Sequence, residues 1–149
     1  MRTVSDTYIE NRQRIQPNHV NNYHTAHGGN VVKWMDEVGA MSAMRHAGET
    51  CVTAFINRLD FERPIPEGNI CVIESYAYAV GRTSIRVRLQ AYREDPRTGE
   101  RERTTDSYFV FVAVDDEMSP IPVPAIEADS DRCCRLRDAA LAGEDGHRG

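Results

Sequence analysis

The chain has 149 residues and a formal net charge of −5, with 40 % hydrophobic and 28 % charged residues. This length and balance indicate one folded domain with a core of its own. The acidic balance argues against nucleic acid as a partner, and no apolar run approaches the ~18–20 residues that span a bilayer. Residues 1–15 contain no apolar signal core, so we expect a cytoplasmic protein without a membrane partner.

The first half of the chain predicts a strand, a loop and a long helix. Residues 1–15 are polar with scattered β-forming side chains, and residues 16–27 are a loop rich in Asn and His. From Gly28 to Ala47 the apolar side chains recur at helical spacing, and Gly48 is a natural stop. On a helical wheel, one side of this helix carries Val31, Trp34, Met35, Val38, Met41, Ser42 and Arg45.

Asp36 falls beside that stripe rather than at its centre. Its neighbours on the wheel are Val32, Gly39 and Ala43, which are small or medium-sized, so a ligand or a second chain could reach the carboxylate. Gly39 inside a helix costs roughly 1 kcal/mol relative to Ala. Its presence indicates either the close approach of another group or tight packing within the fold, and the sequence leaves both open.

After the helix the hydrophobic period changes to two, which predicts four more strands. These strands cover residues 51–61, 70–80, 83–92 and 104–114. The short connections between them favour an antiparallel sheet of about five strands, and one long helix packed on that sheet gives the α+β class. Pro120, Pro122 and Pro124 then end regular pairing.

The end of the chain differs in composition from the rest. Residues 127–149 hold acids, arginines and alanines, which predicts a polar tail after a domain at residues 1–126. Ser130 is a candidate N-cap for a short helix that runs to Leu141, before Gly143. We expect the residues after that helix to be disordered.

The stretch that carries most chemistry lies at the start of the long helix, where Gly28 and Gly29 follow the polar loop. Glycines let backbone N–H groups approach a ligand, and the first N–H groups of a helix lack partners and carry partial positive charge. Such a site suits an oxygen that becomes negative during a reaction. Asp36, two turns further on, offers a general base or a nucleophile.

The sequence gives little support to a metal site. His19, His24 and His27 are irregularly spaced in the loop and match no recognisable ligand pattern. No cysteine pair has zinc spacing, and Cys51 and Cys71 lie in apolar strand patterns that predict buried thiols. We therefore expect neither a metal nor a cofactor.

Taken together, these residues resemble a known family. His27-Gly28-Gly29, followed after six residues by Asp36-Glu37, is similar to a motif of the hotdog-fold acyl-CoA thioesterases. The family's Asn, seven positions before the first Gly, is here Asn21, and its helical acid is here Asp36. His24 departs from the pattern, since relatives often have Gly there. Further similar runs, over about residues 10–126, are Asn57 to Pro64, Gly68, Gly81-Arg82-Thr83-Ser84, Phe109 to Asp115, and Pro122-Val123-Pro124 as a last strand.

The resemblance implies a single hotdog domain that hydrolyses acyl-CoA to a fatty acid and CoA, with CoA as part of the substrate. It implies that a backbone N–H of Gly28 or Gly29 stabilises the carbonyl oxygen. Asp36 would act as general base or nucleophile, and Asn21 would orient the water or the thioester. The turn of Arg82, Thr83 and Ser84 would contact CoA, with His27 and Arg58 as further candidates.

The resemblance also implies a homodimer, with each site built between two subunits. A trimer of such dimers is an expectation that rests on the family alone. In this interpretation Asn21 and Asp36 of one site come from different chains, so an isolated chain would be inactive.

Other interpretations stay open beside this one. Asp36 could be a solvated helix residue, Asn21 could only stabilise its own loop, and Arg82 could be a surface charge. A hotdog enoyl-CoA hydratase or dehydratase is disfavoured, because one branch carries a His where Met41 stands. A non-catalytic acyl-CoA-binding sensor is the third possibility, although both catalytic-type polar residues are retained. The chain contains no Gly-x-Ser-x-Gly elbow, which disfavours a serine esterase.

Overall fold

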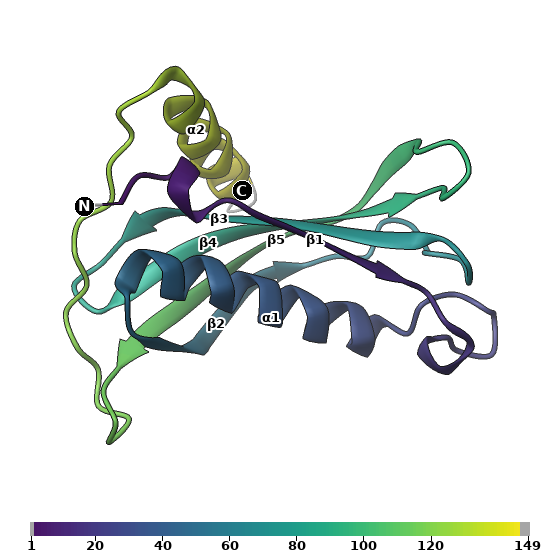
Figure 1. Cartoon of the computed structure of the whole chain (residues 1–149), viewed down its shortest axis with the longest axis horizontal. Coiled ribbons are helices and arrows are strands. Elements are labelled where there is room, and N and C mark those ends of the chain that lie inside the picture. Colours follow the sequence, from purple (N-terminus) through teal and green to yellow (C-terminus); the bar gives the residue numbers. More distant parts are fainter. Residues whose placement is uncertain (1, 147–149) are drawn as a thin grey trace.

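The computed structural model describes residues 2–146, and within them the chain forms one antiparallel sheet with a helix on each face (Figure 1). The helix and the four strands predicted after it are all present, with ends within three residues of those expected. In chain order the elements are η1 (Ser5–Thr7), β1 (Ile9–Arg14), η2 (Pro17–His19), α1 (Gly28–Ala47), β2 (Thr50–Leu59), β3 (Ile70–Val80), β4 (Ser84–Glu94), β5 (Arg101–Val114) and α2 (Asp131–Gly146).

The five strands lie in the order β1-β3-β4-β5-β2, and every neighbouring pair is antiparallel. This confirms the α+β prediction of a five-stranded antiparallel sheet. The two edge strands are therefore β1 and β2. The strand β1 lies within residues 1–15, where the sequence predicted the first strand. The strand β2 contains two register shifts, around residues 53–55 and 56–59, which mark β-bulges.

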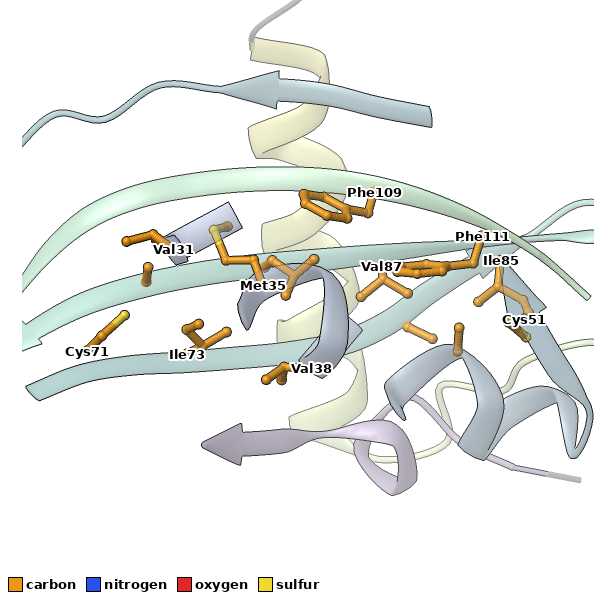
Figure 2. Close-up of a cluster of buried hydrophobic side chains, with 14 of the residues drawn as sticks. Val31, Met35, Val38, Cys51, Cys71, Ile73, Ile85, Val87, Phe109 and Phe111 are labelled. Carbon is orange, nitrogen blue, oxygen red and sulfur yellow. The ribbon is translucent and has the colours of Figure 1, made fainter. Parts of the chain in front are cut away.

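The main core lies between α1 and the sheet. Alternate residues of β4 are buried beneath the helix because side chains of a strand point to opposite faces in turn. Figure 2 shows Val31, Met35 and Val38 of α1 against the sheet. The sheet residues that it labels in this core are Cys51, Cys71, Ile73, Ile85, Val87, Phe109 and Phe111.

The buried side of α1 is rotated from the one that the helical wheel predicted. Met41 is 42 % exposed and Arg45 is exposed, whereas Gly39 and Ala43 are buried against the sheet. A Cβ on Gly39 would lie 2.9 Å from Leu89 and 3.0 Å from Phe111. Tight packing within the fold, one of the two explanations left open, therefore accounts for this glycine. The error arose because the wheel weighted large apolar side chains, whereas the sheet packs against the small Gly39 and Ala43 as well as against Val31, Met35 and Val38.

The outer face of the sheet is covered by α2, which lies on the opposite side from α1 (Figure 1). Ser130 caps the helix as predicted, because its hydroxyl accepts from the Cys133 N–H at 3.1 Å. The predicted end at Leu141 is wrong, since the helix continues to Gly146. A Cβ on Gly143 would overlap the Tyr108 hydroxyl, so this glycine permits close helix–sheet packing instead of ending the helix.

Buried polar contacts also attach α2 to the sheet. The Tyr78 hydroxyl donates to the Glu144 carboxylate at 2.7 Å, and the Tyr76 hydroxyl donates to the Leu136 carbonyl at 2.7 Å. The part of the predicted tail at residues 131–144 thus packs on the sheet. The disorder expected after Leu141 is wrong for residues 142–146, which are helical, and residues 147–149 lie outside the described residues.

The prolines after β5 do not form a last strand. The Ile121 N–H donates a hydrogen bond to the Ala113 carbonyl, and the Val123 N–H donates one to the Arg82 carbonyl. The only strand-like pairing in this described segment is an isolated bridge between Pro120 and Val114. Proline lacks an N–H donor, so a ladder cannot continue through Pro122 and Pro124.

Two of the cysteines lie in the core, as predicted. Burial raises the pKa of Cys51 to about 11 and that of Cys71 to about 12, so both thiols stay protonated near neutral pH. Between residues 2 and 146, no helix is both long enough and apolar enough to cross a bilayer.

Candidate active site

Asn21 organises the loop that leads into α1. Its side-chain oxygen accepts from the backbone N–H groups of Tyr23, at 2.9 Å, and Thr25, at 3.3 Å. It also accepts from the Thr25 hydroxyl at 3.2 Å. These contacts match the loop-stabilising alternative for Asn21. They use the amide oxygen, so the amide NH₂ is the part of the side chain that can still donate to a ligand.

The helix start contains one N–H group that has no acceptor. His27 is the N-cap of α1, and its ring nitrogen Nδ1 accepts from the Gly29 N–H at a long 3.4 Å. Within residues 2–146 no acceptor contacts the Gly28 N–H, and its position as the first residue of the helix rules out an intrahelical partner. Gly28 is thus the better-placed of the two predicted oxyanion donors, and His27 shapes this helix end.

Asp36 contacts the edge strand through Thr53. The Thr53 hydroxyl donates a short hydrogen bond to Asp36 Oδ1, and Thr53 stands at the first bulge of β2. Bulges redirect side chains and are frequent beside active sites. Asp36 is half-buried and Thr53 is exposed, so this pair lies at the surface next to an unpaired strand edge. The strand pattern contained no sign of Thr53, because a Thr in a strand is ordinary.

Within one chain, the predicted catalytic residues do not converge. Asp36 follows Gly28 by eight residues, which places the two roughly 12 Å apart along α1 at 1.5 Å per residue. No hydrogen bond joins Asn21 to Asp36 in the described part of the chain. A carbonyl carbon cannot lie within bonding reach of groups this far apart.

The predicted CoA-contacting turn lies at the other end of the molecule from Gly28. Arg82 and Thr83 lie in the β3–β4 connection, and Ser84 begins β4, where it pairs with Val112 of β5. Thr104 lines the same pocket as Gly28 and precedes Val112 by eight residues on β5. At about 3.3 Å per residue, roughly 26 Å of strand therefore separates the Arg82 turn from the Gly28 region. Arg82 is exposed. Arg58, the other predicted cation, is engaged with Asp60 at 3.2 Å and Glu62 at 3.9 Å.

A pocket of about 330 Å³ opens beside Gly28, and we call it the Phe61 pocket. Its walls come from the loop before α1, the first turn of α1, the segment after β2, and β5. The lining includes Thr25, Gly28, Val31, Phe61, Ile65 and Thr104. Phe61 does not stand out as a site residue in the sequence, because a single aromatic after a strand has no distinctive spacing.

The loop histidines before α1 contact other groups of the protein. In residues 2–146, no group of three or more His, Cys, Asp or Glu side chains could hold a metal ion together. The His19 ring instead accepts from the Gln16 N–H at 2.9 Å and packs edge-on against Trp34. The exposed His24 ring lies 3.6 Å from Glu67.

The chain is similar to proteins of one family throughout most of its length. Residues 23–100 match the family model of the thioesterase superfamily. The uncharacterized acyl-CoA thioester hydrolase YkhA of Bacillus subtilis is 31 % identical over 140 residues, which are 94 % of this chain and 81 % of that protein.

Solved structures agree with this match. An acyl-CoA hydrolase from Staphylococcus aureus, in complex with butyryl coenzyme A, superposes with a TM-score of 0.87 at 30 % identity, covering 99 % of this chain and 90 % of that one. In three further structures of that hydrolase, a single Asn, Asp or Thr is replaced by alanine. In its sequence the Asp follows the Asn by 15 residues, and the Thr follows the Asp by 17 residues. A hexameric acyl-CoA thioesterase has a TM-score of 0.86 at 32 % identity, covering 98 % of this chain and 94 % of that one.

Proposed function

The chain belongs to the thioesterase superfamily and is an acyl-CoA thioester hydrolase, and from that premise we propose how its residues perform the reaction. The Asp36–Thr53 hydrogen bond carries the proposal, because it fixes a carboxylate at an accessible strand edge. Asn21, Asp36 and Thr53 follow one another at 15 and 17 residues, the spacing of the three residues replaced in the Staphylococcus aureus hydrolase.

Asp36 acts as the general base in this proposal. It takes a proton from a water molecule, and the resulting hydroxide adds to the thioester carbonyl carbon. The Gly28 N–H donates to the oxygen that becomes negative, and one such donor is worth roughly 3–4 kcal/mol in the transition state. The carbon–sulfur bond then breaks, and the CoA thiolate leaves and is protonated. Direct attack by Asp36, which gives an anhydride, is the alternative route.

The separation of Gly28 from Asp36 supports a site made by two chains. An Asp36 carboxylate and a Gly28 N–H can act on one carbonyl if a second copy brings its helix start to the first copy's Asp36. We propose a homodimer related by a two-fold axis, as most soluble homo-oligomers are. The hexameric relative makes a trimer of such dimers the assembly to test first.

The two sheet edges differ in a way that selects β2 for this contact. On β1, Glu10 pairs with Arg101 at 2.6 Å and Arg12 pairs with Glu94 at 3.5 Å, and charged edges oppose strand pairing. On β2, residues 53–57 are exposed, and Phe55 has 56 % of its surface accessible. Pairing of two β2 edges would cover these side chains and bring the Asp36–Thr53 pair to the interface.

In such a dimer the CoA portion would extend away from the Gly28 that binds the carbonyl oxygen. The exposed Arg82, with Thr83 and Ser84, is the candidate for its phosphates, because this turn lies at the opposite end of the sheet from Gly28. Arg58 is a weaker candidate, since two carboxylates already neutralise it.

The test is the release of free thiol from acyl-CoA by the wild-type protein and by Asp36→Asn. Loss of the base lowers kcat by about 10²-fold or more. Glu37→Gln is the matched control, because it removes the adjacent, exposed carboxylate of the same helix and should leave kcat unchanged. Equal turnover in Asp36→Asn and wild type would remove Asp36 from the mechanism, and hydration of an enoyl-CoA without thiol release would replace the proposed reaction.

A further inference from the structure

The Phe61 pocket has an apolar interior. Val31 and Ile65 are each 3 % exposed and form its buried wall. Phe61 is 48 % exposed and its ring lies over Gly28, where a Cβ would be 3.5 Å from the ring edge. Phe61 is therefore the large side chain at the boundary between the pocket and solvent, directly beside the free Gly28 N–H.

The pocket walls include four polar side chains, those of Thr25, Glu62, Arg63 and Thr104, and each has a partner; Glu62 and Arg63 form an ion pair at 3.8 Å. The Thr25 hydroxyl donates to Asn21 at 3.2 Å, and the Thr104 hydroxyl donates to the Ala91 carbonyl at 3.1 Å. A group rich in amides, such as pantetheine, would leave its own polar atoms unpaired against these walls, which is costly. A hydrocarbon has no such requirement.

Backbone hydrogen bonds hold the pocket walls together. The Ala26 N–H donates to the Ile65 carbonyl at 2.7 Å, which ties the loop before α1 to the segment after β2. The Glu62 N–H donates to the Thr104 carbonyl at 2.8 Å, which ties that segment to β5. The cavity is thus a fixed part of the fold on three sides.

We propose that the Phe61 pocket receives the acyl chain of the substrate and that Phe61 limits the chain length. This rests on the proposed function, since a carbonyl oxygen bound at the Gly28 N–H places the first acyl carbon at the mouth of the pocket. A volume of about 330 Å³ is at the low end for ligand pockets, which span roughly 300–1,000 Å³. We expect butyryl and octanoyl chains to be held within this volume, and a palmitoyl chain, which is longer, to meet Phe61 where the pocket opens to solvent.

The experiment compares kcat/KM for butyryl-, octanoyl- and palmitoyl-CoA in the wild type, Phe61→Ala and Phe61→Trp. Phe61→Ala should raise the palmitoyl-to-butyryl ratio of kcat/KM by about tenfold or more, since a few methylenes in an apolar pocket discriminate at least this strongly. Phe61→Trp should lower the octanoyl-to-butyryl ratio. Met118→Ala is the control, because Met118 is an exposed apolar residue outside the pocket and should leave both ratios unchanged.

The possible outcomes separate this inference from the proposed function. An active wild type whose chain-length ratios are the same in both Phe61 variants overturns the pocket assignment and leaves the hydrolase intact. An equal rise in KM for all three substrates assigns the pocket to pantetheine and also overturns it. A wild type that releases thiol from none of the three overturns the proposed function, and the acyl pocket with it. If Phe61→Ala lowers the melting temperature, Phe61→Trp and Phe61→Leu supply the comparison.

Discussion

At the residue scale, Thr53 links the candidate base to the sheet. A half-buried carboxylate on a helix can adopt several rotamers, and the hydrogen bond from the Thr53 hydroxyl favours one of them. Hydrogen bonds to charged groups contribute about 1.5–3 kcal/mol, so this contact is strong enough to position Asp36. In the proposed mechanism, Thr53 thus acts through Asp36, as a positioning residue.

Replacing Thr53 tests that role. Thr53→Val keeps the shape but removes the donor, and we expect kcat/KM to fall about tenfold or more with an unchanged melting temperature. Thr53→Ser keeps the hydroxyl and should restore most of the activity. Steady-state thiol release measures both variants. A Thr53→Val protein as active as Thr53→Ser would mean that the hydrogen bond has no part in catalysis.

Gly39 is a second residue whose neighbours decide its identity. A side chain there must displace Leu89 or Phe111, and overpacking a core costs about 1–3 kcal/mol. We expect Gly39→Val to lower the free energy of unfolding by this amount, as measured by urea titration with an unchanged m-value. Arg45→Val, at an exposed position of the same helix, should change it by no more than about 0.5 kcal/mol. A stability equal to wild type in Gly39→Val would show that the sheet yields there.

At the element scale, the sequence predicts the elements better than their contacts. The change of hydrophobic period after Gly48 predicts α1 and the strands, because that period reflects which face is buried. Which side of α1 is buried, and the course of α2 past Gly143, depend on where small residues meet the sheet. The pairing of Asp36 with Thr53 depends on a bulge in β2, a property of the ladder that local sequence does not specify. The motif at Gly28 was found from the sequence because its chemistry is local to one helix start.

The surroundings of Cys133 at the start of α2 predict a pH-dependent stability. Burial of the Cys133 thiol raises its pKa, but hydrogen bonds from Ser130, Ser5 and Thr3 outweigh burial and lower the pKa to about 7. An ordinary cysteine has a pKa of 9.0 on the same scale, so from pH 7 to 9 the unfolded chain binds more protons at this position. The thiolate therefore adds stability as pH rises through this window, and below pH 7 it adds none.

A comparison of melting temperatures tests this effect. The difference between wild type and Cys133→Ser should widen in favour of wild type from pH 7 to pH 9, because a serine hydroxyl does not titrate there. Cys134→Ser is the control, since it removes the adjacent cysteine without touching Cys133 Sγ. Parallel curves for wild type and Cys133→Ser across the window would show that the thiol stays protonated.

At the scale of the whole molecule, the proposed site is divided into two halves that lie apart on one chain. The first half is the helix start, with the free Gly28 N–H and the Asn21 loop, and the second is the Asp36–Thr53 pair at the β2 edge. Roughly 12 Å of helix keeps them apart. A two-fold axis that joins two β2 edges would place each half against the complementary half of the other copy, so that one dimer contains two complete sites.

Complementation between inactive variants tests this arrangement. Asn21→Ala and Asp36→Ala are each expected to lose activity. Co-expressed in equal amounts, they should form mixed dimers in which one of the two sites has both residues intact. Because half of randomly formed dimers are mixed, the preparation should recover about a quarter of the wild-type activity. Co-expression of Asp36→Ala with Asp36→Asn is the control and should recover none. If Asn21 and Asp36 acted within one chain, the first pair would be as inactive as the control, because no chain in the mixture would carry both residues.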